Sequence, residues 1–201
     1  MFRLTAFLVP LAALALSSCA SRTEPVAAHS YLEGIGNPLS LATLTPSHIE
    51  NESHWDGDGI SGSPKIVIDL SDQKASFYKD DHLVGVSPIS SGKSSHPTPT
   101  GHFKVTQKNV DHRSSWYGDY VDDAGNVVVK EIDNRKDRRP PGTRYLGADM
   151  GYFMRFNGPI GMHRGFLPGY PASHGCIRLP EEMAAIYFDH APIGTPVIVV
   201  R

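Results

Sequence analysis

The chain has 201 residues, of which 40% are hydrophobic, with 19 basic and 21 acidic side chains and a formal net charge of −2. This balance lacks the basic excess of a surface that tracks phosphates, so we expect no nucleic-acid partner. The length suffices for one domain with a hydrophobic core and an additional tail.

The chain begins with a segment typical of an export signal. Arg3 precedes an almost wholly apolar, uncharged stretch over residues 4–16, which is too short to span a bilayer core of about 30 Å as a helix. A Leu-Ser-Ser-Cys run then ends at Cys19 and resembles a bacterial lipobox, in which the cysteine is lipidated. We therefore predict a lipoprotein signal peptide over residues 1–18 with Cys19 as the lipidation site. The alternative is an ordinary cleaved signal in which Cys19 is incidental.

This leader predicts where the protein works. We expect it to be exported and held in the cell envelope by lipid on Cys19, facing the periplasm. Small residues after Cys19 favour the outer membrane over the inner membrane, by resemblance to sorting rules.

Composition divides the remaining chain in two. Residues 19–63 are rich in Ser, Pro, Gly, Thr and Asn and predict a flexible tether, whereas residues 64–201 predict a folded domain. An Asp-Gly-Asp-Gly run starts at Asp56 and is similar to a calcium loop, but the twelfth position holds Val67 instead of the expected glutamate. We interpret the run as a polar turn.

The predicted domain is mainly β. Residues 66–70 and 74–79 form a predicted hairpin around a polar turn, because β-branched and aromatic residues alternate on both sides. Further strands are expected at residues 83–90, 103–107, 126–130, 152–157, 158–162 and 196–200. One helix is expected to begin at Pro180 and end before Pro192, with acidic residues in its first turn and apolar residues at core spacing.

Between residues 108 and 150, only residues 126–130 are expected to form a strand. A charged run at residues 130–139, followed by two prolines, could form a lid over a cleft, although a solvated surface loop is the preferred interpretation. The aromatic residues in this region could line a cleft, but packing in the core is preferred for them: Trp116, Tyr117, Tyr120 and Tyr145.

Cys176 is the candidate nucleophile. If Cys19 carries lipid, Cys176 has no disulfide partner within the chain, and a lone thiol in an oxidising compartment favours a reactive role over a packing role. A thiol with a pKa of about 8.5 needs a base to act as a nucleophile. His163 is the better candidate, because the Gly- and Pro-rich loop at residues 164–172 can return it to the cysteine, whereas His174 is too close along the chain.

Backbone groups are expected to complete this site. No Asp or Glu occurs between residues 150 and 180, so we expect a backbone carbonyl near Arg164 to orient the imidazole of His163. Gly175 has no Cβ and lets a substrate approach the backbone closely. The amides of Gly175 and Cys176 could therefore stabilise an oxyanion.

Arg178 and His174 have competing interpretations. Arg178 lies two residues after Cys176 and would share its face in an extended chain. It could lower the thiol pKa or hold a substrate carboxylate, and the alternative is a surface ion pair. His174 could contact the reacting group, and the alternative is a structural, hydrogen-bonded histidine.

These residues carry a resemblance to a known family. His163 followed by Ser-His-Gly-Cys at residues 173–176 resembles the active-site motif of the L,D-transpeptidase (YkuD-like) family. An upstream Thr-Pro-Thr-Gly-His-Phe block at residues 98–103, with Ser-Gly-Lys at 91–93 before it, and a closing Gly-Thr-Pro-Val block at 194–197 are also similar to the family. The resemblance covers residues 64–201.

The family resemblance implies a mainly β catalytic domain of sandwich or barrel type, with one packed helix and no cofactor or metal. It implies that Cys176 attacks the carbonyl between the third residue, a diaminopimelate or its equivalent, and the terminal D-alanine of a peptidoglycan stem peptide. His163 would then act as base and acid, with the carbonyl of Arg164 orienting it. The acyl group would pass to an amine on another stem or on a protein acceptor.

The resemblance also assigns pocket residues, namely Ser173, His174 and Arg178. The chain departs from the common pattern in the short loop between His163 and Ser173 and in the insertion at residues 108–150. These departures leave the acyl acceptor open.

Three alternatives remain. Water as acceptor would make the protein an L,D-carboxypeptidase. His163, His174 and Cys176 are acceptable zinc ligands, so a zinc-dependent hydrolase is the second alternative. A wall-binding lipoprotein without activity is the third.

Overall fold

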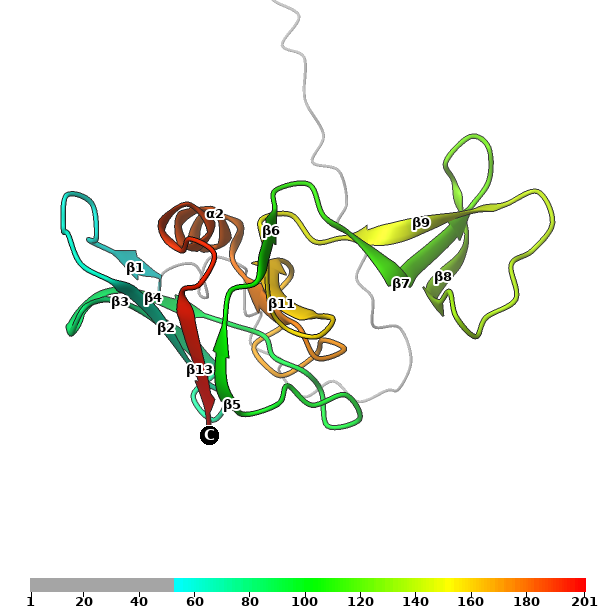
Figure 1. Cartoon of the computed structure of the whole chain (residues 1–201). Coiled ribbons are helices and arrows are strands. Elements are labelled where there is room, and N and C mark those ends of the chain that lie inside the picture. Colours follow the sequence, from blue (N-terminus) through cyan, green and yellow to red (C-terminus); the bar gives the residue numbers. More distant parts are fainter. Residues whose placement is uncertain (1–52) are drawn as a thin grey trace, which may run out of the picture. The chain divides into compact units, whose positions relative to one another are not determined.

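The computed structural model describes residues 53–201. The predicted signal peptide (1–18), Cys19 and the predicted tether up to residue 52 lie outside the described residues. Residues 53–201 form strands and one helix (Figure 1), which confirms the predicted mainly β class with one helix. That part of the chain contains no helix with the length and apolar character needed to cross a bilayer.

The largest sheet has six strands in the order β1-β4-β3-β2-β13-β5. Its members are β1 (His54–Trp55), β2 (Pro64–Asp69), β3 (Lys74–Lys79), β4 (His82–Pro88), β5 (Gly101–Lys104) and β13 (Pro196–Val200). Strands β2 and β13 pair in parallel and the other pairs are antiparallel, so the sheet is mixed. Asp69 closes the predicted β2–β3 hairpin, because its carboxylate accepts bonds from the amides of Ser71 and Asp72 at 2.8 and 3.1 Å.

A second sheet of four strands has the order β12-β11-β10-β6. It comprises β6 (Gln107–Asn109), β10 (Phe153–Asn157), β11 (Ile160–Arg164) and β12 (Ile177–Leu179). Strands β11 and β12 are parallel. None of the sheets formed by residues 53–201 closes on itself, so of the two predicted arrangements the barrel is not found.

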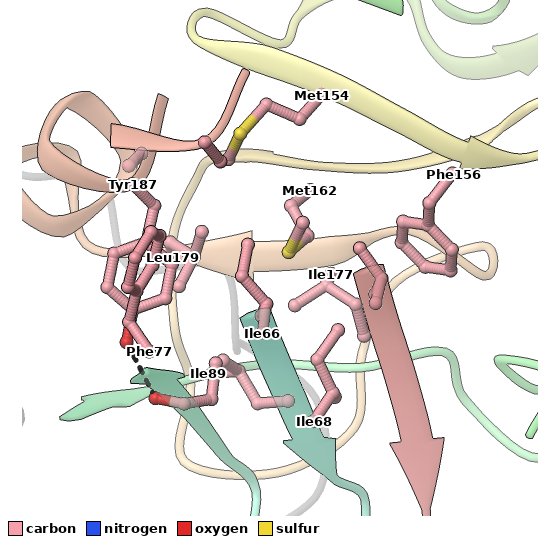
Figure 2. Close-up of a cluster of buried hydrophobic side chains, with 14 of the residues drawn as sticks. Ile66, Ile68, Phe77, Ile89, Met154, Phe156, Met162, Ile177, Leu179 and Tyr187 are labelled. Atoms are coloured by element: carbon pink, nitrogen blue, oxygen red, sulfur yellow. Dashed lines mark hydrogen bonds between the residues drawn. The ribbon is translucent and has the colours of Figure 1, made fainter. Parts of the chain in front are cut away.

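The core lies between the first two sheets and helix α2 (Glu181–His190). Figure 2 shows Ile66 and Ile68 of β2 meeting Met162 and Ile177 of the second sheet, and all four side chains are fully buried. Tyr187 of α2 is also fully buried, and its hydroxyl donates to the carbonyl of Ala75 at 2.8 Å. Pro180 occupies the position directly before the helix, in agreement with the predicted start.

Residues 54–63, which composition assigned to the tether, contact the domain. Strand β1 pairs with β4, and the ring of Trp55 lies 5.3 Å from that of Phe77. The ammonium of Lys79 donates to the carbonyls of Gly57 and Ile60, both at 2.7 Å. These contacts arise because an otherwise buried ammonium needs acceptors and Trp55 covers apolar surface. The Asp-Gly run itself forms a turn, as interpreted.

The insertion is more ordered than the sequence indicated. Strands β7 (Arg113–Val121), β8 (Val127–Asp133) and β9 (Arg144–Asp149) form a third sheet in the order β8-β7-β9. Only the region of β8 was predicted as a strand, because glycines and charged residues break the apolar alternation elsewhere. The charged run at residues 130–139 begins in β8 and is therefore not simply a surface loop.

Candidate active site

The parallel pairing of β11 and β12 brings His163 and Cys176 together. Met162 lies opposite Ile177 and His163 lies opposite Arg178, while Cys176 directly precedes β12. Met162 and Ile177 point into the core. Because side chains alternate along a strand, His163, Cys176 and Arg178 face the other side. There they line a shared cavity of about 460 Å³.

His163 is held as a neutral imidazole with a defined tautomer. Its side chain is buried, and Nδ1 lies 2.6 Å from the carbonyl oxygen of Arg164. A carbonyl only accepts hydrogen bonds, so Nδ1 carries the proton and Nε2 is left as an acceptor. Burial lowers the pKa of His163 to about 4, although the Arg164 carbonyl opposes this shift.

Arg164 is fixed from both sides. Its guanidinium donates to Asp149 on β9 at 2.8 Å and to Glu181 on α2 at 2.6 Å, and its amide donates to Gly151 at 2.9 Å. These bonds hold the backbone that carries the carbonyl against His163. The site thus depends on an ion pair with the third sheet and on another with the helix.

Cys176 is a half-buried thiol, and burial raises its pKa. A backbone hydrogen bond from Gly161 and the charges of Arg155 and Arg178 act in the opposite direction and reduce the rise. With a raised pKa on sulfur and a lowered pKa on His163, the proton rests on the thiol at neutral pH. The arrangement therefore suits a base that takes the proton as sulfur attacks.

The turn before Cys176 is shaped by Ser173 and Thr98. Ser173 Oγ donates to the carbonyl of Cys176 at 2.5 Å, and the hydroxyl of Thr98 donates to the carbonyl of Gly175 at 2.9 Å. Gly175 has a φ of +111°, which a residue with a Cβ rarely adopts. Thr98 thus supports the turn directly, which is a structural reason for the two sequence blocks to occur together.

The two amides named as oxyanion donors differ in this structure. The Gly175 N–H donates to Ser173 Oγ at 3.0 Å, whereas the Cys176 N–H has no acceptor within residues 53–201. To stabilise an oxyanion, the Gly175 N–H would have to leave Ser173 Oγ and donate to the substrate oxygen instead. The oxyanion role of Gly175 stays a prediction.

His174 packs against aromatic rings and not beside Cys176 in a metal-binding cluster. Its ring stacks on Tyr117 of β7 with centroids 4.2 Å apart, and His96 meets it edge-on at 4.8 Å. In the described part of the chain, no three His, Cys, Asp or Glu side chains form a group that could hold a metal ion. The geometry does not support the zinc alternative at His163, His174 and Cys176.

The cavity also contains residues that the sequence did not single out. His112 and Arg155 line it, and so do Trp116 and Tyr117, for which packing in the core was preferred. Of the four aromatic residues, Tyr120 is fully buried, but within the third sheet, where its ring packs against that of Tyr145. No local motif marks His112 or Arg155, because only the sheet pairing brings them to this face.

Arg178 lies along the wall of the same cavity. Its guanidinium points toward the carbonyl of Phe166 at 3.5 Å, and burial lowers its pKa while the charges of Cys176 and Glu131 act in the opposite direction. The structure therefore places this side chain close to the thiol, where a substrate carboxylate could reach it. The choice between substrate clamp and ion-pair partner stays a prediction.

Comparisons with known proteins agree on one family. The model of the L,D-transpeptidase catalytic domain (YkuD) matches residues 63–199. YqjB of Bacillus subtilis, which is described as an L,D-transpeptidase, is 27% identical over 70% of this chain and 73% of its own length. A Mycobacterium tuberculosis protein described as L,D-transpeptidase 3 is 32% identical over 71% of this chain and 47% of its own length.

The solved structures give the same answer for the fold. The crystal structure of an Enterococcus faecium L,D-transpeptidase carrying a cysteine-to-serine mutation is 26% identical, with a TM-score of 0.52. The match covers 70% of this chain and 50% of that chain. The present chain thus spans about half the length of two of these three relatives.

Proposed function

Because the chain belongs to the YkuD family of L,D-transpeptidase catalytic domains, we propose that it transfers peptidoglycan stem peptides through an acyl intermediate on Cys176. The observation that carries this proposal is the shared cavity of Cys176 and His163. His163 is neutral there and has its acceptor nitrogen available, because Nδ1 is bound to the carbonyl of Arg164.

The first half-reaction follows from these protonation states. As Cys176 Sγ attacks the carbonyl carbon of the stem, its proton passes to Nε2 of His163 and the carbonyl oxygen becomes an oxyanion. The Cys176 N–H supports that oxyanion. When the tetrahedral intermediate collapses, the bond to the terminal D-alanine breaks and His163 returns the proton to the leaving amine. A thioester remains on Cys176.

The second half-reaction repeats these steps with an acceptor. An incoming amine attacks the thioester, loses a proton to His163, and the thiol leaves with that proton. Ser173 supports the backbone of the turn, and His174 and Arg178 shape the cavity. We propose an amine on a second stem or on an anchored protein as acceptor, and water as acceptor would make the reaction hydrolytic.

We also propose that the enzyme works in the cell envelope, facing the periplasm and attached by lipid on Cys19. The apolar leader and the Leu-Ser-Ser-Cys run support this proposal. Mass spectrometry of the N-terminal peptide from the native host tests it. The expected result is a diacylglyceryl group on Cys19 at the mature N-terminus, and an unmodified Cys19 would contradict it.

Incubation with a disaccharide-tetrapeptide tests the chemistry. Mass spectrometry is expected to show an adduct on Cys176 and release of D-alanine. Cys176→Ala should give no adduct and should release D-alanine at least about a thousandfold more slowly. His163→Asn is expected to fold and to lose most activity. Activity that survives Cys176→Ala but disappears with a chelator would overturn the proposal. Product analysis with and without an added amine separates transfer from hydrolysis.

A further inference from the structure

Arg155 lies in the same row of the second sheet as the proposed nucleophile. It pairs with Gly161 across β10 and β11, and Gly161 in turn lies beside Cys176, since Met162 pairs with Ile177. Neighbours in a row point to the same face, and two strand spacings amount to about 10 Å. Gly161 contributes no side chain between Arg155 and Cys176.

The guanidinium of Arg155 is anchored but retains free donors. Nε donates to Gln107 Oε1 at 2.9 Å and a terminal nitrogen donates to the Gly158 carbonyl at 2.8 Å, while the group lies over the ring of Phe153 at 5.1 Å. A guanidinium has five N–H donors, so three remain. A planar, pre-positioned cation with spare donors is suited to a carboxylate.

The charges around the cavity also favour a carboxylate as the ligand of Arg155. Asp149 is the carboxylate among the residues that line it, and Arg164 binds this group at 2.8 Å. The charge of Glu131 acts on Arg178 and His174. The positive charge of Arg155 acts on the Cys176 thiol, as does that of Arg178.

The two arginines occupy different positions relative to the chemistry. Arg178 lies opposite His163 in the register of β11 and β12. Arg155 lies in the row of Cys176, on the far side of Gly161. His163 must return a proton to the leaving amine, so the leaving group lies toward His163 and Arg178. The retained acyl part therefore extends toward Arg155.

From this placement we propose that Arg155 binds a carboxylate on the acyl part of the stem peptide, on the opposite side from the carboxylate of the leaving D-alanine. The enzyme then selects a donor whose third residue carries a free side-chain carboxylate over the amidated form. This inference rests on the proposed function, which supplies the stem peptide as donor.

Acylation kinetics with two tetrapeptides test the selection. One carries the free carboxylate on the third residue and the other its carboxamide. The enzyme is expected to prefer the free acid by about tenfold or more in kcat/KM, because a charge-assisted bidentate bond is lost on amidation. Arg155→Gln should remove this preference, because the loss of the charge that acts on Cys176 affects both donors alike and only the carboxylate contact distinguishes them.

Three further variants sharpen the test. Arg155→Lys should retain part of the preference, because it keeps the charge but not the planar fork. Arg178→Gln should slow both donors equally, since both carry the D-alanine carboxylate. Lys74→Gln removes a positive charge from an exposed position on β3 and should change neither rate. A preference that persists in Arg155→Gln, or an equal loss with both donors, would overturn the proposal.

Alkylation of Cys176 separates the subsite from the proposed function. Negatively charged iodoacetate and neutral iodoacetamide are compared by peptide mapping. The rate ratio of iodoacetate to iodoacetamide is expected to fall by about threefold or more in Arg155→Gln. That result with no acylation by the stem peptide would contradict the proposed function alone. Acylation with an unchanged ratio and unchanged donor preference would contradict the subsite alone.

Discussion

At the scale of single residues, burial decides the resting state of the site. Removal from water disfavours both the thiolate of Cys176 and the imidazolium of His163, so both groups are neutral at pH 7. A thiolate–imidazolium pair, the other way to activate a cysteine, would require the opposite shifts. The Arg164 carbonyl then fixes which nitrogen of His163 is free to accept.

This resting state predicts an unusual pH dependence of acylation. The base must be neutral, and the pKa of His163 is lowered to about 4, so the rate should hold from pH 7 to about pH 5 and fall as the pH drops through about 4. The measurement is the rate of Cys176 acylation from pH 3.5 to 8, with circular dichroism to confirm folding. An acid limb near pH 6.5 would show that His163 titrates as an exposed histidine.

The same shifts predict the reactivity of the thiol. Because burial raises the pKa of Cys176, alkylation by iodoacetamide should be slow at pH 7 and rise steeply only at alkaline pH. A small-molecule thiol measured in parallel provides the reference curve. Rapid alkylation of Cys176 at pH 6 would contradict the prediction.

At the scale of elements, the third sheet supplies part of the site. Strand β7 brings Trp116 and Tyr117 to the cavity, and Arg135 beyond β8 lies over the Trp116 ring at 4.0 Å. Arg135 also donates to the hydroxyl of Tyr117 at 3.2 Å and to Asp133 at 2.7 Å. Arg135 thus packs on Trp116 and Tyr117, and Tyr117 in turn stacks on His174. The insertion therefore supports one wall of the cavity.

Tyr117 is the residue at which this support can be tested. Tyr117→Ala removes the ring that stacks on His174 and should lower kcat/KM for acylation by about two- to tenfold, the worth of an aromatic pair. Tyr117→Phe keeps the ring and should retain activity within about twofold. Equal losses in both variants would assign the effect to the hydroxyl and its bond to Arg135.

At the scale of the whole molecule, the folded part includes residues before the match to the family model. That match begins at residue 63, but Trp55 packs on Phe77 and lies 4.6 Å from the ring of His190 on α2. Lys79 needs the carbonyls of Gly57 and Ile60 for its buried ammonium. Residues 54–63 therefore stabilise the sheet that supports the site.

Truncation measures this contribution. A chain that starts at residue 64 should have a free energy of unfolding lower by about 3 kcal/mol or more than one that starts at residue 53, because it lacks Trp55 and the acceptors of Lys79. Urea denaturation of both chains provides the comparison. Trp55→Ala in the longer chain should reproduce most of the loss. Equal midpoints would show that residues 53–63 add nothing.

The sequence by itself determined what is encoded locally. The hairpin of β2 and β3, the helix after Pro180, and the Ser-His-Gly-Cys block beside His163 could all be identified, because each depends on alternation, capping or a short motif. The absence of Asp and Glu between residues 150 and 180 also pointed to a carbonyl near His163, and the carbonyl of Arg164 does lie there.

Only the tertiary structure decided which distant residues share the cavity. The register of three strands places Arg155 in the same row as Cys176. Tyr117 stacks on His174 from a sheet in which glycines and charged residues interrupt the apolar alternation. The composition of residues 19–63 predicts a tether and therefore did not indicate that Trp55 packs against the sheet. Strand register and ring packing depend on partners far along the chain, so no local pattern records them.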